Sequence, residues 1–306
     1  MASLDSLIGI LRGAAKAVRD PRRLAQLALE SPSARVEAFE REATALLGGV
    51  PRCVPLEAIL PAQGDALPAF TFLDDTSTVI DLLLLRALVT RYGARTMLEI
   101  GTFRGESSLA VAAAGAKVVT LSLSDEELLT RGSPRSWIDA HRTLSAGNPS
   151  ITHAFGDSGV VDIAPYREWA DILFIDGDHS RGALESDTRR FWSTRSSRVG
   201  AVVWHDAFLS PLVPRWEVIA GIAAGVPSSH RSQLVQVSNT LCLAWLPDGA
   251  SFPTVDRSYV PRIVFSVNVA PVPGWSSKKD AESTNERTAP THPRADGGTS
   301  IAKAHA

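Results

Sequence analysis

The sequence predicts an α/β fold: a mostly parallel sheet with helices on both faces and a last strand that runs in reverse. Short apolar runs alternate with helical segments from residue 76 to about residue 250. The runs are apolar almost throughout, as in parallel strands covered on both faces. The last two, QLVQVSNT and LCLAWLP, are separated by too few residues for a parallel crossover, so the final strand must be antiparallel.

The N-terminal region, residues 1–48, is predicted to be helical. Leu4, Ile8, Leu11, Ala15 and Val18 recur at a spacing of three and four, which gives one apolar stripe beside a basic face. Such a helix packs on the main domain or lies on an anionic membrane surface. The first arrangement is the more common one, and peripheral membrane contact stays open as the alternative. Two more helices are expected, in RRLAQLALE and SARVEAFEREATALLGG.

Residues 49–75 contain four prolines and are predicted to form a linker. The main domain is expected at 76–250, followed by a C-terminal extension at 251–269. Residues 270–306 are polar, mixed in charge and nearly free of large apolar side chains. They cannot bury enough surface to offset the entropy of ordering, so this tail is predicted to be disordered.

Inside the main domain, strands are expected at short apolar runs and helices where apolar residues recur at helical spacing. The expected strands are TMLEIG, KVVTLSL, ITHAF, ADILFID, GAVVWHD and the closing pair. The expected helices are about 77–92, about 106–114, about 134–146, RGALESDTRRFW and PRWEVIAGIAAG.

Composition and charge restrict the class of function. The net charge of the 306 residues is −2, so no overall field attracts nucleic acid, and no basic stripe is interleaved with aromatics. Cys53 and Cys242 lie far apart, which argues against a zinc site or a disulfide scaffold and fits the cytoplasm. No apolar run is long enough to span a bilayer, and the N-terminus lacks the features of a secretory signal. The expected partner is a small molecule, and the sequence leaves a homo-oligomer open.

The stretch LEIGTFRGESS places a carboxylate and two glycines at a strand-to-helix turn, where open parallel sheets bind ligands. Gly101 allows a sharp turn, and Gly105 allows the following helix to approach closely. A dinucleotide site favours GxGxxG, whereas ExGxxxG puts Glu99 where it would repel a pyrophosphate and suit a cation. S-adenosylmethionine, which carries an ammonium and a sulfonium, belongs to that class of ligand. A tight turn without a ligand is the structural alternative.

The next two strand ends would complete a nucleoside site. Ser122 stands where dinucleotide folds carry the acid that holds the ribose hydroxyls. Either Ser122 makes a weaker contact itself, or the loop brings Asp125 to that place. Asp157 and Ser158 follow the strand ITHAF, where they could bind an adenine edge or cap a helix.

Acids and imidazoles gather at the ends of two later strands: Asp176, Asp178 and His179 after one, His205 and Asp206 after the other. Neighbouring parallel strands bring both groups to the same rim, where unpaired carboxylates would be costly. Bound Mg²⁺ would relieve their repulsion and lower the pKa of a substrate hydroxyl. Alternatively, the imidazoles act as general bases, because a histidine with a pKa of about 6.5 is largely neutral near pH 7. Helix capping and neutralisation by nearby arginines are the structural alternatives.

Taken in order, LEIGTFRGESS, GDS, DILFIDGDHSRGALESDTRRFW, GAVVWHDAF and VSNTLCLAW resemble the class I S-adenosylmethionine-dependent methyltransferases. The nearest branch contains macrocin-type O-methyltransferases and cephalosporin-hydroxylase-like proteins. The resemblance covers about residues 75–247 and implies a Rossmann-like sheet of seven strands with the last reversed. It implies that Glu99, Gly101 and Gly105 lie on the methionine side of the cofactor and Asp157 near adenine. In metal-dependent relatives, an acid at the Asp176 position and an acid pair after the fifth strand hold Mg²⁺, and here that pair is His205–Asp206.

The predicted function is therefore S-adenosylmethionine-dependent methylation of a hydroxyl on a sugar or another secondary metabolite, with Mg²⁺ as an optional cofactor. The predicted catalytic residues are His179, His205 and Asp206, and the candidate metal ligands are Asp176, His205 and Asp206. The predicted cofactor-binding residues are Glu99, Gly101, Thr102, Phe103, Gly105, Ser107, Ser122, Asp157, Ser158 and Asp176. One alternative is a binding protein that has lost its activity, which Ser122 favours. The other is a nicotinamide oxidoreductase, which the missing GxGxxG disfavours.

Overall fold

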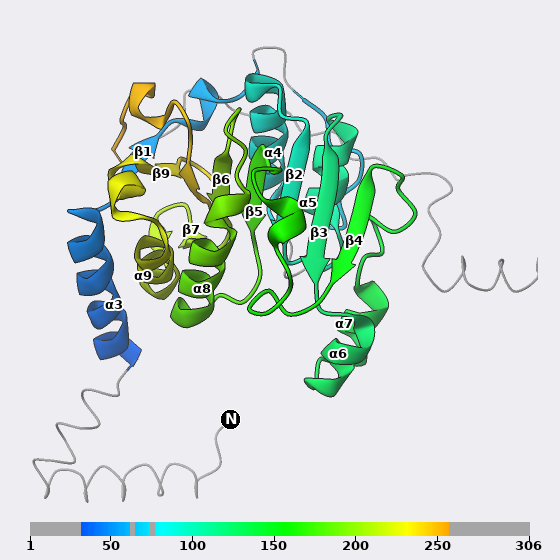
Figure 1. The fold of residues 1–306 in the computed structure, drawn as a ribbon. Coiled ribbons are helices and arrows are strands. Elements are labelled where there is room, and N and C mark those ends of the chain that lie inside the picture. The colour runs from blue at the N-terminus through cyan, green and yellow to red at the C-terminus, as the bar shows by residue number, and fades with distance from the viewer. Residues whose placement is uncertain (1–31, 62–64, 74–76, 257–306) are drawn as a thin grey trace, which may run out of the picture. The chain divides into compact units, whose positions relative to one another are not determined.

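The computed structural model describes residues 32–61, 65–73 and 77–256 (Figure 1). Within them, an eight-stranded sheet has the strand order β1-β9-β10-β6-β5-β2-β3-β4. Its strands are β1 (Arg52–Val54), β2 (Thr96–Ile100), β3 (Lys117–Ser122), β4 (Ile151–Phe155), β5 (Ile172–Ile175), β6 (Ala201–Trp204), β9 (Leu234–Val237) and β10 (Leu243–Trp245). The first two predicted N-terminal helices, the tail at 270–306 and most of the extension at 251–269 lie outside the described residues.

All seven predicted strands are present, and the reversed last strand is confirmed. β10 pairs antiparallel with β6 on one side and with β9 on the other. Every other pair in this sheet is parallel. The predicted Rossmann-like α/β fold with a mostly parallel sheet is therefore confirmed.

The eighth strand, β1, lies inside the segment predicted to be a linker. It pairs parallel with β9, with Cys53 opposite Gln236. Val255 N–H then donates to Cys53 O at 2.9 Å, which ties the extension to the same edge. Three residues carry no periodic pattern, and their partner strand lies far along the chain, so local sequence does not reveal this strand.

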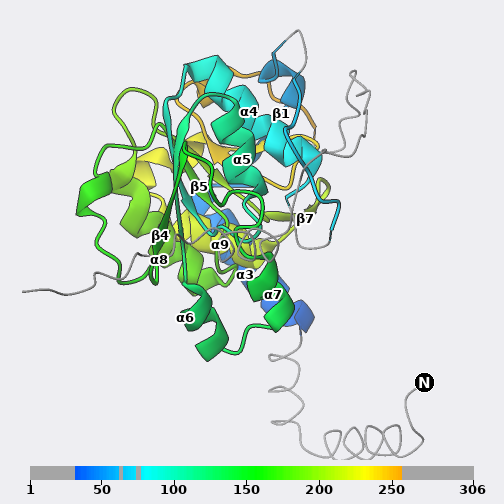
Figure 2. The ribbon, with the colours of Figure 1, turned by 90° about the vertical axis from the view of Figure 1, so that its right-hand side faces the viewer.

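Helices cover both faces of the sheet. α4 (Val79–Tyr92) and α5 (Glu106–Ala113) pack on one face, and α3 (Pro32–Leu47), α8 (Arg181–Phe191) and α9 (Trp216–Gly225) lie on the other (Figures 1 and 2). Alternate residues of β2 contribute to the two cores: Met97 belongs to the α4–α5 side and Leu98 to the α8–α9 side. Among the described helices, none combines the length and apolar character that crossing a bilayer requires.

The start of α4 holds a buried acid. Thr78 and Asp81 form a capping box, in which each side chain accepts a hydrogen bond from the other residue's backbone N–H. The helix ends at Gly93, whose φ of 59° gives the left-handed cap. The cap therefore fixes the position of the Asp81 carboxylate at the end of the sheet nearest β6 and β10.

The predicted helix at 134–146 is shorter in the structure. α7 (Arg135–Ala140) ends at Ala140 and is preceded by a separate helix, α6 (Asp125–Thr130). The N–H of Arg142, whose φ is 64°, donates to Phe103 O at 2.6 Å. The chain after Ala140 therefore bonds to the turn between β2 and α5, which ends the helix. Both views show α6 and α7 beyond the lower end of the sheet (Figures 1 and 2).

A small hairpin of β7 (Phe208–Ser210) and β8 (Val213–Pro214) follows β6 and was not predicted. Its two ends are joined, because Arg215 N–H donates to Ala207 O at 2.9 Å. This bond brings the residues on either side of the hairpin, Asp206 and Arg215, to the same place at the end of β6.

Candidate active site

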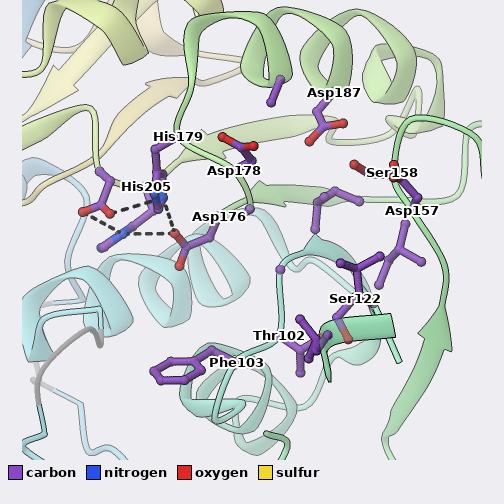
Figure 3. Close-up of a pocket in the computed structure, with 18 of the residues that line it drawn as sticks. Thr102, Phe103, Ser122, Asp157, Ser158, Asp176, Asp178, His179, Asp187 and His205 are labelled. Atoms are coloured by element: carbon purple, nitrogen blue, oxygen red, sulfur yellow. Dashed lines mark hydrogen bonds and ion pairs between the residues drawn. The ribbon is translucent and has the colours of Figure 1, made fainter. Parts of the chain in front are cut away.

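A pocket of about 940 Å³ opens at the carboxyl ends of the parallel strands, where a sheet of this type binds ligands (Figure 3). The turns after β2, β3, β4, β5 and β6 all contribute to its wall. Ten predicted site residues line it: Gly101, Thr102, Phe103, Ser122, Asp157, Ser158, Asp176, His179, His205 and Asp206. The predicted strand-end cluster is thus assembled, while its contacts with a cofactor stay predictions.

Glu99, Gly105 and Ser107 do not line the pocket but build the turn behind it. Glu99 is fully buried, and its two oxygens accept hydrogen bonds from the hydroxyls of Ser107 and Ser108. Its carboxylate is therefore held by the first turn of α5 rather than presented to a ligand. At Gly105, where φ is 83°, a Cβ would lie 2.1 Å from Ser145 Oγ, so only glycine lets α5 begin this close to that residue.

Burial raises the pKa of Glu99 from 4.5 to about 7. The hydrogen bonds from Ser107 and Ser108 act in the opposite direction, but the effect of burial is larger. A raised folded-state pKa contributes stability that is complete below pH 4.5 and is lost as pH rises through 7. One pKa unit corresponds to about 1.4 kcal/mol, so the gap between 4.5 and 7 amounts to about 3 kcal/mol.

Glu99→Gln should remove this pH dependence. Between pH 4.5 and pH 8, the unfolding free energy of the wild type should fall by about 3 kcal/mol relative to that of the variant. Urea unfolding at several pH values measures the difference. The matched control is Glu37→Gln on α3, where the side chain is 67% exposed, and its curve should stay parallel to that of the wild type. Parallel curves for Glu99→Gln would contradict the prediction.

Gly101 brings two strand-end turns together. Its φ is 97°, and a Cβ at this position would lie 2.0 Å from the backbone oxygen of Asp176. Phe103 follows with a φ of 41°, and its ring packs against Trp137 at 4.8 Å between centroids. Both aromatic rings line the pocket. The missing side chain at Gly101 therefore sets the distance between the turns after β2 and β5, which both line the pocket.

Ser122 reaches an acid through a histidine. Its Oγ lies 3.0 Å from His141 Nε2, and His141 Nδ1 lies 2.6 Å from Asp125 Oδ1. Arg142 donates to the other oxygen of Asp125 at 2.8 Å. Ser122 and His141 line the pocket, and Asp125 does not. Of the two alternatives at this strand end, Ser122 is the residue that faces the pocket, and Asp125 holds it through His141.

The far side of the pocket is acidic. Asp157 accepts hydrogen bonds from Arg131 at 2.6 Å and from Gly159 N–H at 2.8 Å, and these bonds lower its pKa. Its carboxylate thus stabilises the turn after β4 while it lines the pocket. Asp187 on α8 is 4% exposed and faces Ser158. Burial raises the pKa of Asp187, and this effect is larger than the opposite effect of the hydrogen bond from Ser158.

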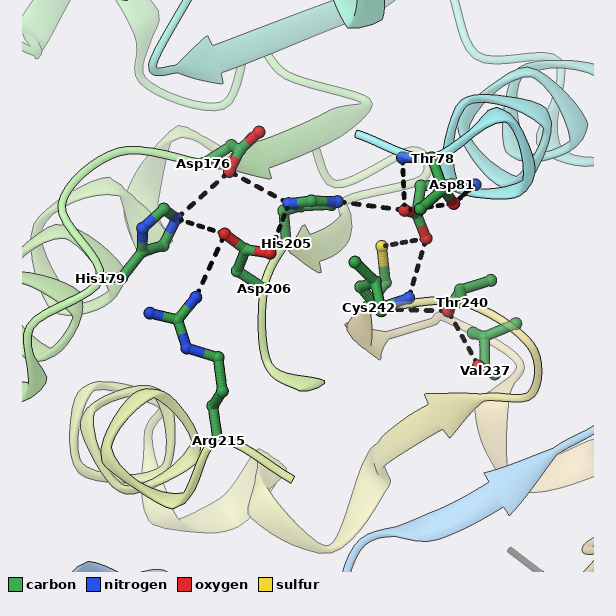
Figure 4. Close-up of polar contacts among 11 residues, drawn as sticks. Thr78, Asp81, Asp176, His179, His205, Asp206, Arg215, Val237, Thr240 and Cys242 are labelled. Carbon is green, nitrogen blue, oxygen red and sulfur yellow. Dashed lines mark hydrogen bonds and ion pairs between the residues drawn. The ribbon is translucent and has the colours of Figure 1, made fainter. Parts of the chain in front are cut away.

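The predicted rim assembles as one network of acids and cations (Figure 4). His179 Nε2 lies 3.4 Å from Asp176 Oδ1 and 3.2 Å from Asp206 Oδ2. Arg215 Nη1 lies 3.2 Å from the same oxygen of Asp206. Asp206 adopts a φ of 55°, which turns its carboxylate back toward the strand ends. Asp176 and Asp206 therefore each face more than one nitrogen donor.

His205 is buried between carboxylates on both sides. Its Nε2 lies 3.1 Å from Asp81 Oδ2, and its Nδ1 lies 3.3 Å from both Asp176 Oδ1 and Asp206 Oδ1. Burial lowers the pKa of His205, but the charge of Asp176 and the contact with Asp81 raise it well above the ordinary value. Burial likewise raises the pKa of Asp81 and of Asp176, but the pairing with His205 brings both below the ordinary value. The raised pKa favours the imidazolium form of His205, which has no lone pair for the general-base or metal-ligand role predicted for it.

The rim does not fit Mg²⁺. The ligand atoms of Asp176, His205 and Asp206 lie within 4.8 Å of one another, as the sequence predicts. Mg²⁺ requires oxygen ligands in octahedral geometry at about 2.0–2.1 Å. Here the facing carboxylate oxygens are met by N–H groups of His205, His179 and Arg215, and two of these groups already supply positive charge.

Sequence reasoning missed four residues of this site: Asp81, His141, Asp187 and Arg215. Asp81 and Asp187 are acids on the buried faces of α4 and α8. A charged residue on an otherwise apolar helix face is a usable signal, since burying it requires a partner. His141 and Arg215 lie next to helix ends and carry no such signal.

No protein-family model matches the chain, and no curated protein matches it. Among solved structures, the chain is similar to an O-methyltransferase from Bacillus cereus in complex with SAH, with 18% identity over 68% of this chain and 90% of that chain and a TM-score of 0.38. It is also similar to an SAH-bound methyltransferase from Podospora anserina, with 15% identity over 57% and 81% and a TM-score of 0.36. A third is CalS10, an amino pentose methyltransferase from Micromonospora echinaspora, with 16% identity over 40% and 45% and a TM-score of 0.28. These three structures are methyltransferases that hold SAH or S-adenosylmethionine, and the likeness of the chain to them is partial.

Proposed function

We propose that the chain is an S-adenosylmethionine-dependent methyltransferase whose acceptor is a hydroxyl of a small molecule, a sugar or another secondary metabolite. The observation that carries this proposal is the acidic pocket at the strand ends. Five carboxylates line the pocket, those of Asp157, Asp176, Asp178, Asp187 and Asp206. Such a pocket suits a ligand with positive charge rather than a pyrophosphate. The choice of a small-molecule hydroxyl as the acceptor is supported by the resemblance of the sequence motifs to macrocin-type O-methyltransferases.

The lining residues fit the cofactor at three places. Gly101 lets the turn after β2 lie directly against the backbone of Asp176, and the methionine end would lie beside these two turns. Ser122, held by His141, would bind the ribose hydroxyls. Asp157 and Ser158 would bind the adenine edge.

When bound, S-adenosylmethionine supplies a methyl group on a positively charged sulfur, which becomes a neutral thioether as the methyl group leaves. The chain must place the acceptor oxygen in line with that bond and take up the hydroxyl proton. His179 fits this second role, because its side chain is partly exposed in the pocket and its Nε2 faces the carboxylates of Asp176 and Asp206. With the Nε2–H directed at those carboxylates, Nδ1 keeps a lone pair to accept the proton.

Cys53 and Cys242 are buried cysteines, which supports a reducing compartment, and we place the reaction in the cytoplasm.

Calorimetry tests the proposal directly. The purified full chain should bind S-adenosylmethionine with micromolar affinity and should show no heat with NADH. His179→Gln should retain this binding but lose methyl transfer by about 10²- to 10⁴-fold, the usual contribution of a general base. Transfer is measured with labelled cofactor against a panel of hydroxylated sugars and aglycones.

The outcomes separate the alternatives. Absence of heat at high micromolar S-adenosylmethionine would refute the proposal, and heat with NADH would favour an oxidoreductase. Binding without transfer to any acceptor would support the non-catalytic alternative, for which Ser122 is the motivating residue.

A further inference from the structure

His205 has a buried acid behind it that the proposed chemistry does not use. Asp81 is fully buried, and donors surround its carboxylate. Its Oδ2 accepts from Thr78 N–H at 2.9 Å and from Thr78 Oγ1 at 2.7 Å, and its Oδ1 accepts from Leu241 N–H at 2.9 Å and from Cys242 Sγ at 3.6 Å. A carboxylate with this many donors is ionised, so the Nε2 of His205, 3.1 Å from Oδ2, must carry hydrogen.

The other ring nitrogen of His205, Nδ1, also faces carboxylate oxygens. His205 Nδ1 lies 3.3 Å from an oxygen of Asp176 and 3.3 Å from an oxygen of Asp206 (Figure 4). An acceptor nitrogen facing two carboxylate oxygens would be repelled by both, whereas an N–H is attracted to both. Both ring nitrogens of His205 therefore carry hydrogen, which only the imidazolium form allows.

We propose that the rim works without a divalent metal: His205, held doubly protonated between Asp81 and the pair Asp176 and Asp206, supplies the positive charge that a metal would supply. Asp81 is the positioning residue, because it fixes the ring and the proton on Nε2 from outside the pocket. The catalytic part of this inference rests on the proposed methyltransferase function, and the assignment of charge does not.

The charges of the rim agree with this arrangement. Three carboxylates, those of Asp81, Asp176 and Asp206, face two cations, protonated His205 and Arg215. One negative charge remains beside the place where the sulfonium would lie. A bound Mg²⁺ would instead have to displace the N–H of His205 or the guanidinium of Arg215 from the oxygens it needs. With both nitrogens of His205 occupied, His179 is left as the imidazole of the rim that can accept a proton.

Three measurements on the wild-type protein test the proposal. In protein labelled with ¹⁵N-histidine, His205, identified by the signals missing in His205→Gln, should show two ring N–H signals at pH 8, where an ordinary histidine is neutral. Electron paramagnetic resonance should detect no Mn²⁺ bound at millimolar concentration, and methyl transfer should be unchanged after dialysis against EDTA. A single N–H signal, bound Mn²⁺ or loss of activity that Mg²⁺ restores would each overturn the proposal.

Asp81→Asn tests the positioning role. The variant should lose one of the two N–H signals of His205 at pH 8. Because the ring is then misplaced, it should also lose about tenfold or more in turnover, with cofactor binding retained. Asp248→Asn is the matched control, since it changes another paired acid, bonded to Arg91 and Tyr92 and absent from the pocket lining. Both signals and full turnover in Asp81→Asn would refute the positioning role.

Failure of this inference and failure of the proposed function are distinguishable. Two N–H signals without any binding of S-adenosylmethionine would refute the proposed function and support the assignment of charge to His205. One N–H signal in a protein that binds the cofactor would refute the assignment of charge alone.

Discussion

Replacing Gly101 with alanine should abolish cofactor binding and lower the unfolding free energy by about 2 to 6 kcal/mol. The added Cβ would lie 2.0 Å from the backbone oxygen of Asp176 and 2.6 Å from its carbonyl carbon. Both are backbone atoms, so no side chain can rotate away and the turn after β5 has to move. That movement displaces the Asp176 carboxylate and with it the contact to His205.

Gly115→Ala provides the matched control. Gly115 has a φ of 98°, nearly the same as that of Gly101, but no atom lies within 4 Å of a Cβ built there. Gly115→Ala should therefore lower the unfolding free energy by the backbone strain alone, about 1–2 kcal/mol, and should leave cofactor binding unchanged. Urea unfolding and calorimetry measure the two quantities. Equal losses in both variants would show that the contact with Asp176 contributes nothing.

Removing the imidazole in His205→Ala should destabilise the protein by about 3–5 kcal/mol near pH 6, because it leaves the Asp81 carboxylate buried without its cation. The double variant Asp81→Asn, His205→Ala should recover part of this loss, since the buried charge is then gone. Arg135→Ala is the control at the surface: the Arg135–Asp139 pair is 73% and 37% exposed, and its loss should cost at most about 0.5 kcal/mol.

The same pair sets a pH window. The raised pKa of His205 contributes stability that is complete below about pH 6.5 and is lost as pH rises through its higher folded value. The lowered pKa of Asp81 contributes stability that is present above about pH 3.8 and is lost as pH falls. The loss of stability in His205→Ala should therefore be greatest between about pH 4 and pH 6.5. A loss that does not vary with pH would mean that the pair is not ionised.

Most of the sheet could be predicted because its central strands, β2, β5 and β6, are largely buried and mostly apolar. The reversal of β10 followed from the short connection after β9, since no crossover fits there. What could not be predicted depends on distant partners. The Arg142 N–H leaves the helical pattern because the Phe103 carbonyl is within reach, and this neighbour is a consequence of the fold.

The candidate site divides in the same way. Strand ends are fixed by topology, so the meeting of Asp176, His179, His205 and Asp206 followed from their positions after neighbouring strands. Asp81 lies 124 residues before His205 and belongs to a helix, so its contact depends on how α4 packs against the end of the sheet. The protonation of His205 depends on that contact, which is why the sequence alone suggested a neutral base.

The place of β10 in the sheet has a consequence for the order in which the protein folds. β10 lies between β9 and β6. Within the described residues, the β1–β9 pair therefore joins the rest of the sheet through β10, the last of these strands to leave the ribosome. The strands from β2 to β6 can pair while synthesis continues, whereas Arg52–Val54 must wait until Leu243–Trp245 has emerged. During that interval β6 presents an unpaired apolar edge, and this is the stage at which the nascent chain is most exposed to aggregation or to chaperone binding.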